Sequence, residues 1–164
     1  MALVIEDGSI VAGADSFATA AELVTYAANY GRTIPSETAA QESLLRRAAL
    51  QMSAMSWKGG LVDELQSLSW PRYDVYRDNW LVPSDSIPAQ IKAGQMALAA
   101  EIHADDLAPP DLKVGAIESE KVGPISSTYA KAAAYIARPA ATRQSYAQFG
   151  PFLEASNQVK LVRG

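Results

Sequence analysis

Three stretches of the chain carry apolar residues at helical spacing, and each is bounded by residues that start or stop helices. The predicted helices cover residues 17–30, 37–55 and 87–103. Gly31 follows the first helix as a C-terminal stop, and Pro88 stands in the first turn of the third. Amphipathic helices bury their apolar stripes against one another. The pattern therefore predicts a mainly α fold, a small helical bundle centred on the alanine-rich third helix.

The chain beyond the third helix has a different character. Residues 112–130 have β-type content on both sides of Gly123, which predicts a β-hairpin or extended insertion. Residues 131–164 lack a compact helical pattern and are predicted to form an extended C-terminal arm. Because 164 residues are short for two cores, we expect one domain overall. Its predicted parts are a helical body at 1–111, a β-type extension at 112–130 and a docking arm at 131–164.

The two ends of the sequence carry opposite charge. Residues 1–120 hold eight basic side chains against seventeen acidic ones, whereas residues 121–164 hold six basic side chains against the single Glu154. The acidic body argues against a general nucleic-acid-binding protein, which usually has a basic footprint. The asymmetry predicts that the basic end meets a different partner from the body. The alternative is that it folds back on the acidic body of the same chain.

The predicted arm contains aromatic side chains that a purely solvated tail would not keep. Such a segment can dock by burying apolar anchors on a partner, while its charges select that partner. The alternative is that the aromatics cover the chain's own bundle. We expect that deleting residues 139–164 leaves a folded body. The predicted docking residues are Arg138, Arg143, Phe149, Phe152, Leu153, Lys160, Leu161, Val162 and Arg163.

The sequence offers little for catalysis. It has no cysteine, which excludes a thiolate nucleophile and a zinc–sulfur site, and His103 is its single histidine. It also lacks a Gly-x-Ser-x-Gly elbow, a phosphate-binding loop and a dinucleotide fingerprint. We therefore expect a protein that is not an enzyme and uses no metal or cofactor. No apolar run approaches the roughly 20 residues of a membrane span, and the N-terminus is not a signal peptide, so we expect synthesis in the cytoplasm and no membrane contact.

Residues 69–80 interleave aromatics with arginines, an arrangement that can stack the bases and neutralise the phosphates of a single strand. The contacts predicted for this alternative function are Trp70, Arg72, Tyr73 and Arg77. However, Asp74 and Asp78 cancel the two arginines. Trp70 and Trp80 are also natural plugs for the open end of a small helical bundle. Packing is therefore the preferred interpretation of this segment, and single-stranded-DNA binding is the alternative.

Five short blocks resemble, in their order and spacing, a family of small phage proteins encoded among head and tail morphogenesis genes. The blocks are residues 2–8 running on to 14–17, Ser-Trp-Pro-Arg at 69–72, Val-Pro-Ser-Asp-Ser-Ile-Pro at 82–88, Ser-Glu-Lys-Val-Gly-Pro-Ile at 119–125 and Val-Lys-Leu-Val-Arg-Gly at 159–164. Together they span nearly the whole chain. The family often bears the label DnaT-like single-stranded-DNA-binding protein, and its role resembles that of the head-to-tail connector (adaptor) proteins of long-tailed phages.

The resemblance implies a structural protein in the neck of a virion. Connector proteins of this kind are small helical-bundle subunits that form a ring, usually twelvefold, beneath the portal, and their C-terminal arms reach onto it. The partners implied are further copies of the chain, the portal protein and a tail-side neck or tail-completion protein. Genomic DNA would pass through the channel without sequence-specific binding. The acidic body predicted above fits a channel lining that repels DNA better than it fits the DNA-binding label.

Overall fold

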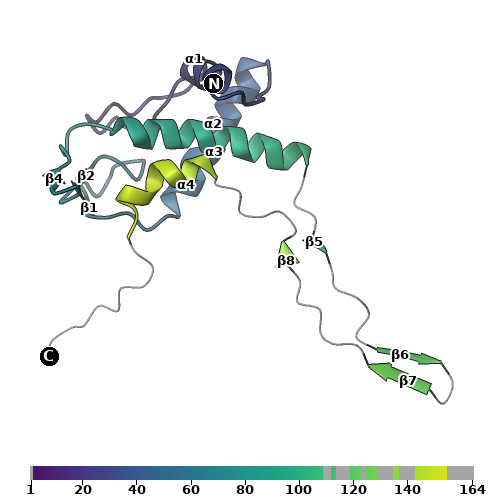
Figure 1. Ribbon diagram of the computed structural model, residues 1–164. Helices are drawn as coiled ribbons and strands as arrows, with labels where there is room; N and C mark the ends of the chain where they lie inside the picture. Colours follow the sequence, from purple (N-terminus) through teal and green to yellow (C-terminus); the bar gives the residue numbers. More distant parts are fainter. Residues whose placement is uncertain are drawn as a thin grey trace, which may run out of the picture.

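The computed structural model describes residues 2–108, 112–113, 119–122, 125–128, 135–136 and 143–154. Its helices are α1 (Ala20–Asn29), α2 (Thr38–Ser53), α3 (Ala89–Leu107), α4 (Gln144–Phe149) and the short 3-10 helix η1 (Gly150–Phe152). Its strands are β1 (Gly60–Leu61), β2 (Arg72–Tyr73), β3 (Tyr76–Arg77), β4 (Trp80–Leu81), β5 (Leu112–Lys113), β6 (Ser119–Val122), β7 (Ile125–Thr128) and β8 (Tyr135–Ile136). Within the described residues the strands pair two by two, so the predicted mainly α fold with a hairpin insertion is confirmed (Figure 1).

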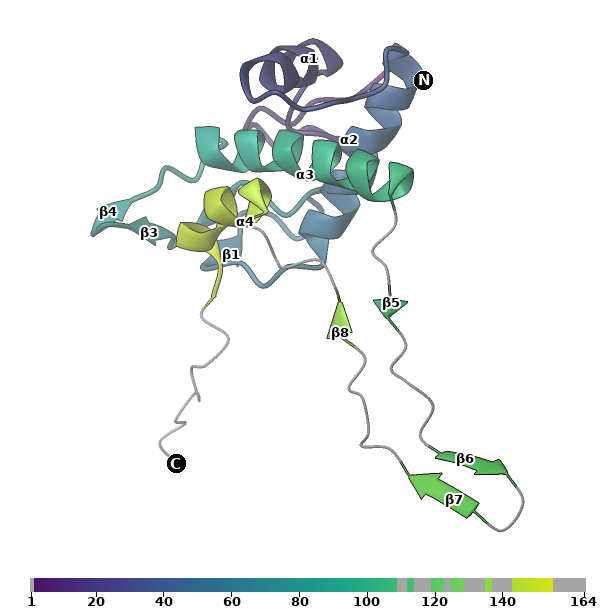
Figure 2. The same cartoon turned by 45° about the vertical axis from the view of Figure 1, so that its right-hand side comes forward.

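Helix α3 runs through the middle of the bundle, and α1, α2 and α4 pack around it (Figures 1 and 2). Nine of its residues are buried, among them Ile91, Leu98 and Ile102. Alanines at 97, 99 and 100 are buried as well, and such small side chains let neighbouring helices approach closely. The alanine-rich helix therefore takes the central place that the sequence predicted.

Helix α1 begins three residues later than its apolar pattern suggested, because a capping box fixes its start. The hydroxyl of Thr19 accepts a hydrogen bond from the backbone N–H of Glu22 (3.2 Å), and the Glu22 carboxylate accepts one from the backbone N–H of Thr19 (2.8 Å). Asp15 and Ser16, residue types that often cap helices, stand earlier in the chain and have other partners. Asp15 forms an ion pair with Arg46 at 2.7 Å, and Ser16 belongs to a buried polar network.

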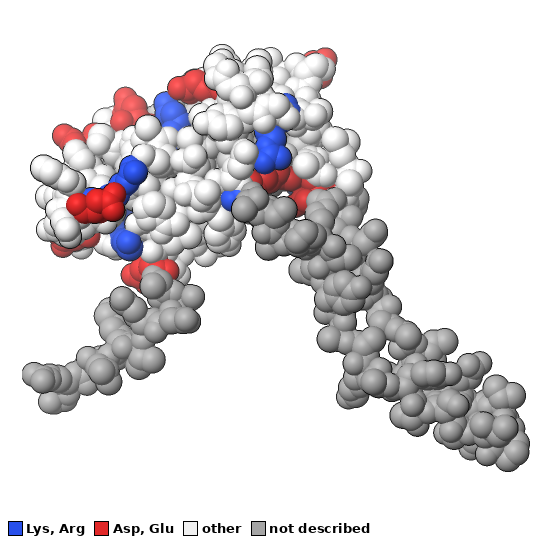
Figure 3. All heavy atoms as spheres, viewed as in Figure 1, with Lys and Arg blue, Asp and Glu red and all other residues white. Residues whose placement is uncertain are grey.

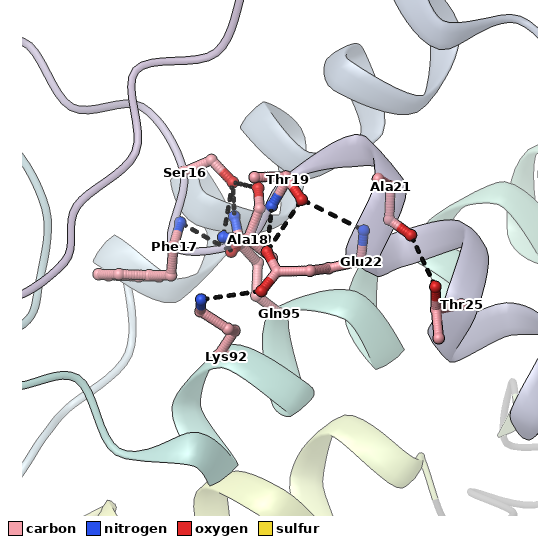
Figure 4. Close-up of polar contacts among 9 residues, drawn as sticks. All are labelled: Ser16, Phe17, Ala18, Thr19, Ala21, Glu22, Thr25, Lys92 and Gln95. Atoms are coloured by element: carbon pink, nitrogen blue, oxygen red, sulfur yellow. Dashed lines mark hydrogen bonds and ion pairs between the residues drawn. The ribbon is translucent and has the colours of Figure 1, made fainter.

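The buried amide of Gln95 joins α3 to the segment before α1 (Figure 4). The same amide also bonds to α2. Gln95 Oε1 accepts hydrogen bonds from the backbone N–H groups of Phe17 (2.9 Å) and Ala18 (3.1 Å). Its Nε2 donates to Ser16 Oγ and to the Leu45 carbonyl, both at 3.0 Å. The amide thus makes all four of the hydrogen bonds open to it. A buried polar group that is fully paired fixes the register of the elements it joins, since any slip leaves it unpaired.

The N-terminal loop folds around a buried carboxylate. Glu6 accepts hydrogen bonds from the backbone N–H groups of Gly8 (2.8 Å), Ile10 (3.0 Å) and Val11 (2.8 Å). Gly8 has a φ of +111°, and a Cβ at this position would lie 2.5 Å from the Asp85 carbonyl oxygen. The loop therefore closes against the segment that leads into α3.

The predicted insertion contains the hairpin β6–β7, which pairs from Ser119 opposite Thr128 to Val122 opposite Ile125. Outside it in sequence, β5 pairs antiparallel with β8. Both pairs lie clear of the helices in the two ribbon views (Figures 1 and 2). Because β8 takes part, the paired region extends beyond the predicted boundary at residue 130.

The C-terminal helix packs on the bundle instead of standing apart as an arm. Residues 143–154 lie along α3, and the Phe149 ring covers Gly94 so closely that a Cβ there would overlap it. Phe149 and Phe152 are 0% and 1% exposed. These predicted anchors of a docking arm therefore belong to this chain's own core, which was the alternative left open for the aromatics. Deleting residues 139–164 would open that core, contrary to the expectation of a folded remainder.

Candidate nucleic-acid interface

Residues 57–82 divide into a buried half and an exposed half. The buried half supplies Trp57 and Trp70, which are 4% and 0% exposed. Their rings meet the C-terminal phenylalanines edge to face, with ring centroids 5.2 Å apart for Trp57 and Phe149 and 5.5 Å apart for Trp70 and Phe152. Trp70 is thus a core residue, as the packing interpretation predicted. It does not reach solvent as a single-strand contact must.

Arg72 is also committed to the fold. Its guanidinium donates to the backbone carbonyls of Lys58 (2.8 Å), Gly59 (2.7 Å) and Ser69 (3.3 Å). Burial lowers the pKa of Arg72 from its usual value, since desolvation disfavours the charged form. A guanidinium that is held by carbonyls on both sides of the 60–68 loop positions that loop. Arg72 is therefore a positioning residue, which removes a second of the four predicted contacts.

The exposed half is a tight hairpin formed by β3 and β4. Tyr76 lies opposite Leu81 and Arg77 lies opposite Trp80, so two residues make the turn. Both turn residues, Asp78 and Asn79, have positive φ (+49° and +66°). This is the backbone of a type I′ turn, which favours Asn and Asp because they tolerate the left-handed region. Asp-Asn between β-type residues is a local sequence signal for such a hairpin.

The hairpin presents aromatic side chains to solvent on both of its faces. Residues directly opposite each other in an antiparallel pair share one face, so Arg77 and Trp80 lie side by side on one face and Tyr76 and Leu81 on the other. Trp80 is 80% exposed and Tyr76 is 55% exposed, while Tyr73 at the foot of the hairpin is half exposed. The prediction that Trp80 plugs the bundle is therefore wrong. Two residues outside the predicted contact set, Trp80 and Tyr76, are the most accessible aromatics of this segment.

A groove of about 410 Å³ runs between the hairpin and the N-terminal end of α3. Its lining is largely apolar and comes from three parts of the chain, including Trp80, Leu81, Pro83, Pro88 and Phe152. An exposed indole beside an apolar groove offers a stacking surface for a planar base or an apolar side chain.

The helical body that carries the hairpin is acidic overall. Residues 2–108 and 143–154 include eight basic and fifteen acidic side chains. Asp63, Glu64, Asp74 and Asp85 make no ion pair within the described residues. Arg77 is the cation of the hairpin itself, and it lies 3.6 Å from the Asp78 carboxylate. In the space-filling view, blue and red side chains lie next to each other at this end of the body (Figure 3).

The remaining predicted docking residues fall in two groups. Arg143 forms an ion pair with Asp105 of α3 at 3.3 Å, and Leu153 is partly buried where it bridges to Trp57. Both therefore contact the chain's own bundle. The rest of the set lies outside the described residues, namely Arg138, Lys160, Leu161, Val162 and Arg163.

No group of three or more histidine, aspartate or glutamate side chains within the described ranges could hold a metal ion. His103 lies on α3 close enough to Asp106 to help keep the pKa of that carboxyl low, although a hydrogen bond from Arg47 is the main cause. Across the same part of the chain, none of the helices combines the length and the apolar character that crossing a bilayer requires.

Comparison with known proteins gives one match. The family model described as "Putative DnaT-like ssDNA binding protein" matches residues 1–164, the full length of the sequence. No curated protein and no solved structure matches the chain.

Proposed function

We propose that this protein, which belongs to the DnaT-like ssDNA-binding family that its whole length matches, binds single-stranded DNA on the β3–β4 hairpin. The observation that carries the proposal is the pairing of Trp80 with Arg77 on one face of that hairpin. An exposed indole can stack on any base, and a guanidinium beside it can contact the adjacent phosphate. Tyr76 on the opposite face and Tyr73 at the foot of the hairpin offer further stacking surfaces.

The acidic surroundings limit how strongly such a site can bind. Stacking contributes about 1–3 kcal/mol per base, whereas each phosphate contact adds about 0.7 to the slope of log affinity against log salt for a single strand. With Arg77 as the cation of the hairpin, we expect weak binding with a shallow salt dependence. The aromatics then supply most of the affinity, and no base is preferred.

Fluorescence anisotropy with a labelled oligothymidine at low salt tests this proposal. Replacing Trp80 by Ala should weaken binding about tenfold, the equivalent of about 1.4 kcal/mol of stacking energy. Leu65→Ala is the matched control, because Leu65 is 85% exposed and lies outside the hairpin. Absence of any binding at low salt would refute the proposal, and so would equal affinities for the Trp80→Ala variant and the wild-type protein.

The second candidate function is that of a head-to-tail connector subunit in the neck of a phage virion, as the resemblance implies. It is supported by large apolar side chains that are exposed on separate elements, Leu50 on α2, Leu107 at the end of α3 and Trp80 on β4. A closed ring needs two different patches on each subunit, one for each neighbour. In this role the protein is not an enzyme and assembles with further copies, the portal protein and a tail-side neck protein.

Cryo-electron microscopy of the assembled particle tests the connector function. The expected result is a ring of this chain between portal and tail, and density for another protein at that position would exclude it. Portal binding by the C-terminal end should be tested by replacing Lys160 and Arg163, because the deletion considered from sequence alone would remove Phe149 and Phe152 from the core. Unchanged portal binding by that double variant would rule out a docking role for these charges.

A further inference from the structure

A second pocket, of about 390 Å³, lies between α1 and α3. One of its walls is Met96 of α3, and the others come from residues of α1 and its C-terminal cap that recur at the three- and four-residue spacing of one helical stripe. These residues are Ala21, Glu22, Thr25, Tyr26, Asn29 and Tyr30. Figure 2 shows α1 along one side of α3 and the hairpin β3–β4 beyond the N-terminal end of α3. The α1–α3 pocket is therefore separate from the hairpin surface.

Two stacked tyrosines form the aromatic wall of this pocket. The ring centroids of Tyr26 and Tyr30 lie 4.3 Å apart, and the ring planes are 25° from parallel. Tyr26 is buried, whereas Tyr30 is half exposed, so the inner ring supports the outer one, which solvent can reach. Met96 adds a polarizable thioether, which makes favourable contacts with aromatic rings. The α1–α3 pocket thus offers a supported surface to a planar ring.

An exposed cation, Arg32, lies beside the tyrosine stack. Its Nε donates a hydrogen bond to Gln144 Oε1, and the Tyr26 hydroxyl donates to the same oxygen atom, both at 3.3 Å. The guanidinium is thereby held next to the tyrosines by a neutral group. Within the described ranges Arg32 makes no ion pair, and its terminal N–H groups have no acceptor there. Unused guanidinium donors are well suited to a phosphate.

Carboxylates also lie near the pocket, but donors already bind them. Glu22 accepts hydrogen bonds from the backbone N–H and the hydroxyl of Thr19, and it forms an ion pair with Lys92 at 3.1 Å (Figure 4). Glu101, whose charge acts on Tyr26, accepts hydrogen bonds from the backbone N–H (3.2 Å) and the hydroxyl (2.6 Å) of Ser145. An anion that enters the pocket therefore finds its open donors on Arg32.

A supported aromatic ring and a guanidinium with unused donors match the two parts of a nucleotide, the base and the phosphate. We propose that the α1–α3 pocket is a second subsite for single-stranded DNA, in which a base stacks on Tyr30 and Arg32 contacts the adjacent phosphate. The choice of ligand rests on the proposed function, although the subsite uses no residue of the hairpin. Asn29 on the pocket wall carries both a donor and an acceptor, so it can meet the edge of any base.

One strand can reach both surfaces, because both border the same part of α3. Gln90 lines the groove beside the hairpin, and Met96 lines the α1–α3 pocket. Six residues of an α-helix correspond to about 9 Å along the axis, with the two side chains about a third of a turn apart. Once one surface holds the strand, binding at the other is intramolecular and gains from a high effective concentration. Affinity should therefore rise with the length of the strand.

Fluorescence anisotropy with oligothymidines of about 4 and about 16 nucleotides tests the subsite, since these lengths bracket the site sizes of single-strand-binding folds. The wild-type protein should bind the longer strand about fivefold more tightly. Ala21→Glu places an anion in the pocket from an exposed helical position. It should weaken binding of the longer strand about fivefold, the effect of one lost stacked base, and abolish the gain with length.

The matched control is Val24→Glu, which adds the same charge to an exposed position of α1 outside the pocket. It should leave affinity within about twofold of wild type and keep the gain with length. Tyr30→Ala removes the stacking ring without adding charge and should reproduce the loss seen in Ala21→Glu. A gain with length that survives in both Ala21→Glu and Tyr30→Ala would overturn the proposal.

The phosphate contact and the identity of the occupant have separate readouts. Arg32→Gln should lower the slope of log affinity against log salt by about 0.7, and an unchanged slope would exclude the phosphate contact. Sedimentation velocity addresses the other occupant that an apolar pocket can take, a second copy of the chain. Self-association that Tyr30→Ala removes, with DNA affinity unchanged by that variant, would assign the pocket to a protein partner and overturn the subsite.

The same titrations separate the subsite from the hairpin proposal. If Trp80→Ala weakens DNA binding while Ala21→Glu, Tyr30→Ala and Arg32→Gln leave it unchanged, the subsite proposal fails alone. If these three variants weaken binding and Trp80→Ala does not, the strand binds at α1 and the hairpin proposal fails. Absence of binding by the wild-type protein at low salt would refute both.

Discussion

Trp70 and Trp80 lie within one short segment, residues 57–82, but their environments differ. Trp70 sits at 0% exposure against Phe152, whereas Trp80, ten residues later, is 80% exposed. Both belong to stretches of aromatic and charged residues that look alike in sequence. The difference comes from α4 and η1, because Phe149 and Phe152 pack edge to face on Trp57 and Trp70, whereas no aromatic ring of the described residues pairs with Trp80. An aromatic segment becomes core or surface according to a partner that lies some 80 residues away in sequence.

The largest effect on stability should follow from removing a side chain of the buried half. Trp70→Ala removes a fully buried indole and should lower the free energy of unfolding by about 3–5 kcal/mol, measured by urea denaturation. Trp70→Phe is the control that keeps a ring at this position. It should cost clearly less, since the Trp70 Nε1–H has no hydrogen-bond partner to lose within the described residues. A Trp70→Ala variant as stable as the wild-type protein would contradict the division into two halves.

A smaller loss of stability is expected from replacing Arg72, which is held by carbonyls of the segment. Arg72→Lys keeps the positive charge but cannot reach the carbonyls of Lys58, Gly59 and Ser69 together. Unsatisfied carbonyls should lower the free energy of unfolding by about 1–3 kcal/mol, again measured by urea denaturation. DNA affinity should stay within about twofold of wild type at low salt. Arg72 was predicted to touch DNA, but in the structure its guanidinium holds backbone carbonyls instead. A loss of affinity without a loss of stability would restore Arg72 to the binding site.

The capping box of α1 lies away from both halves, and changing it should have a smaller effect on stability. Burial acts to raise the pKa of Glu22, but hydrogen bonds from Thr19 and the nearby Lys92 ammonium outweigh it, so the pKa lies below its usual value. The stability this carboxylate adds is therefore present above the unfolded-state pKa and is lost as the pH falls through the folded-state value. Glu22→Gln should cost about 0.5–1 kcal/mol at neutral pH.

The same variant should lose less stability than the wild-type protein when the pH is lowered, which thermal melting at several pH values measures. Equal losses of stability in the variant and in the wild-type protein as the pH falls would contradict this role of the Glu22 carboxylate.

The smallest effect on stability should come from the exposed half. Trp80→Ala removes a side chain that is mostly in solvent already, so the free energy of unfolding should change by less than about 0.5 kcal/mol. The same substitution should have the largest effect on DNA affinity. Trp70 should therefore matter most for the free energy of unfolding, and Trp80 most for DNA affinity. A large stability loss at Trp80 would mean that the hairpin packs against something in solution.

Sequence patterns located the three long helices to within a few residues because apolar spacing and capping residues are local signals. Helix α1 begins later than expected, since the Thr19 capping box fixes its start. The packing of Phe149 over Gly94 could not be read in this way. It depends on two positions far apart in the chain, and an aromatic anchor for a partner has the same composition as one for the chain's own core.

The candidate site was predicted in part. Tyr73 and Arg77 are accessible as expected, whereas Trp70 and Arg72 serve the fold. No periodicity distinguishes an arginine that binds phosphate from one that binds carbonyls, because both uses satisfy the same donors. The accessible Trp80 was within reach of sequence reasoning, since the Asp-Asn turn that exposes it is a local signal.

The ion pair between Arg143 and Asp105 joins the last turn of α3 to the residue before α4, at 3.3 Å between the charged groups, on either side of residues 109–142. The core contacts of Phe149 and Phe152, which follow that stretch, are made to the body itself. The connecting stretch can therefore lengthen, shorten or be exchanged for a linker of a few glycines and serines at an entropic cost that grows only slowly with its length. For protein engineering, we expect this junction to tolerate changes in the length of the connection.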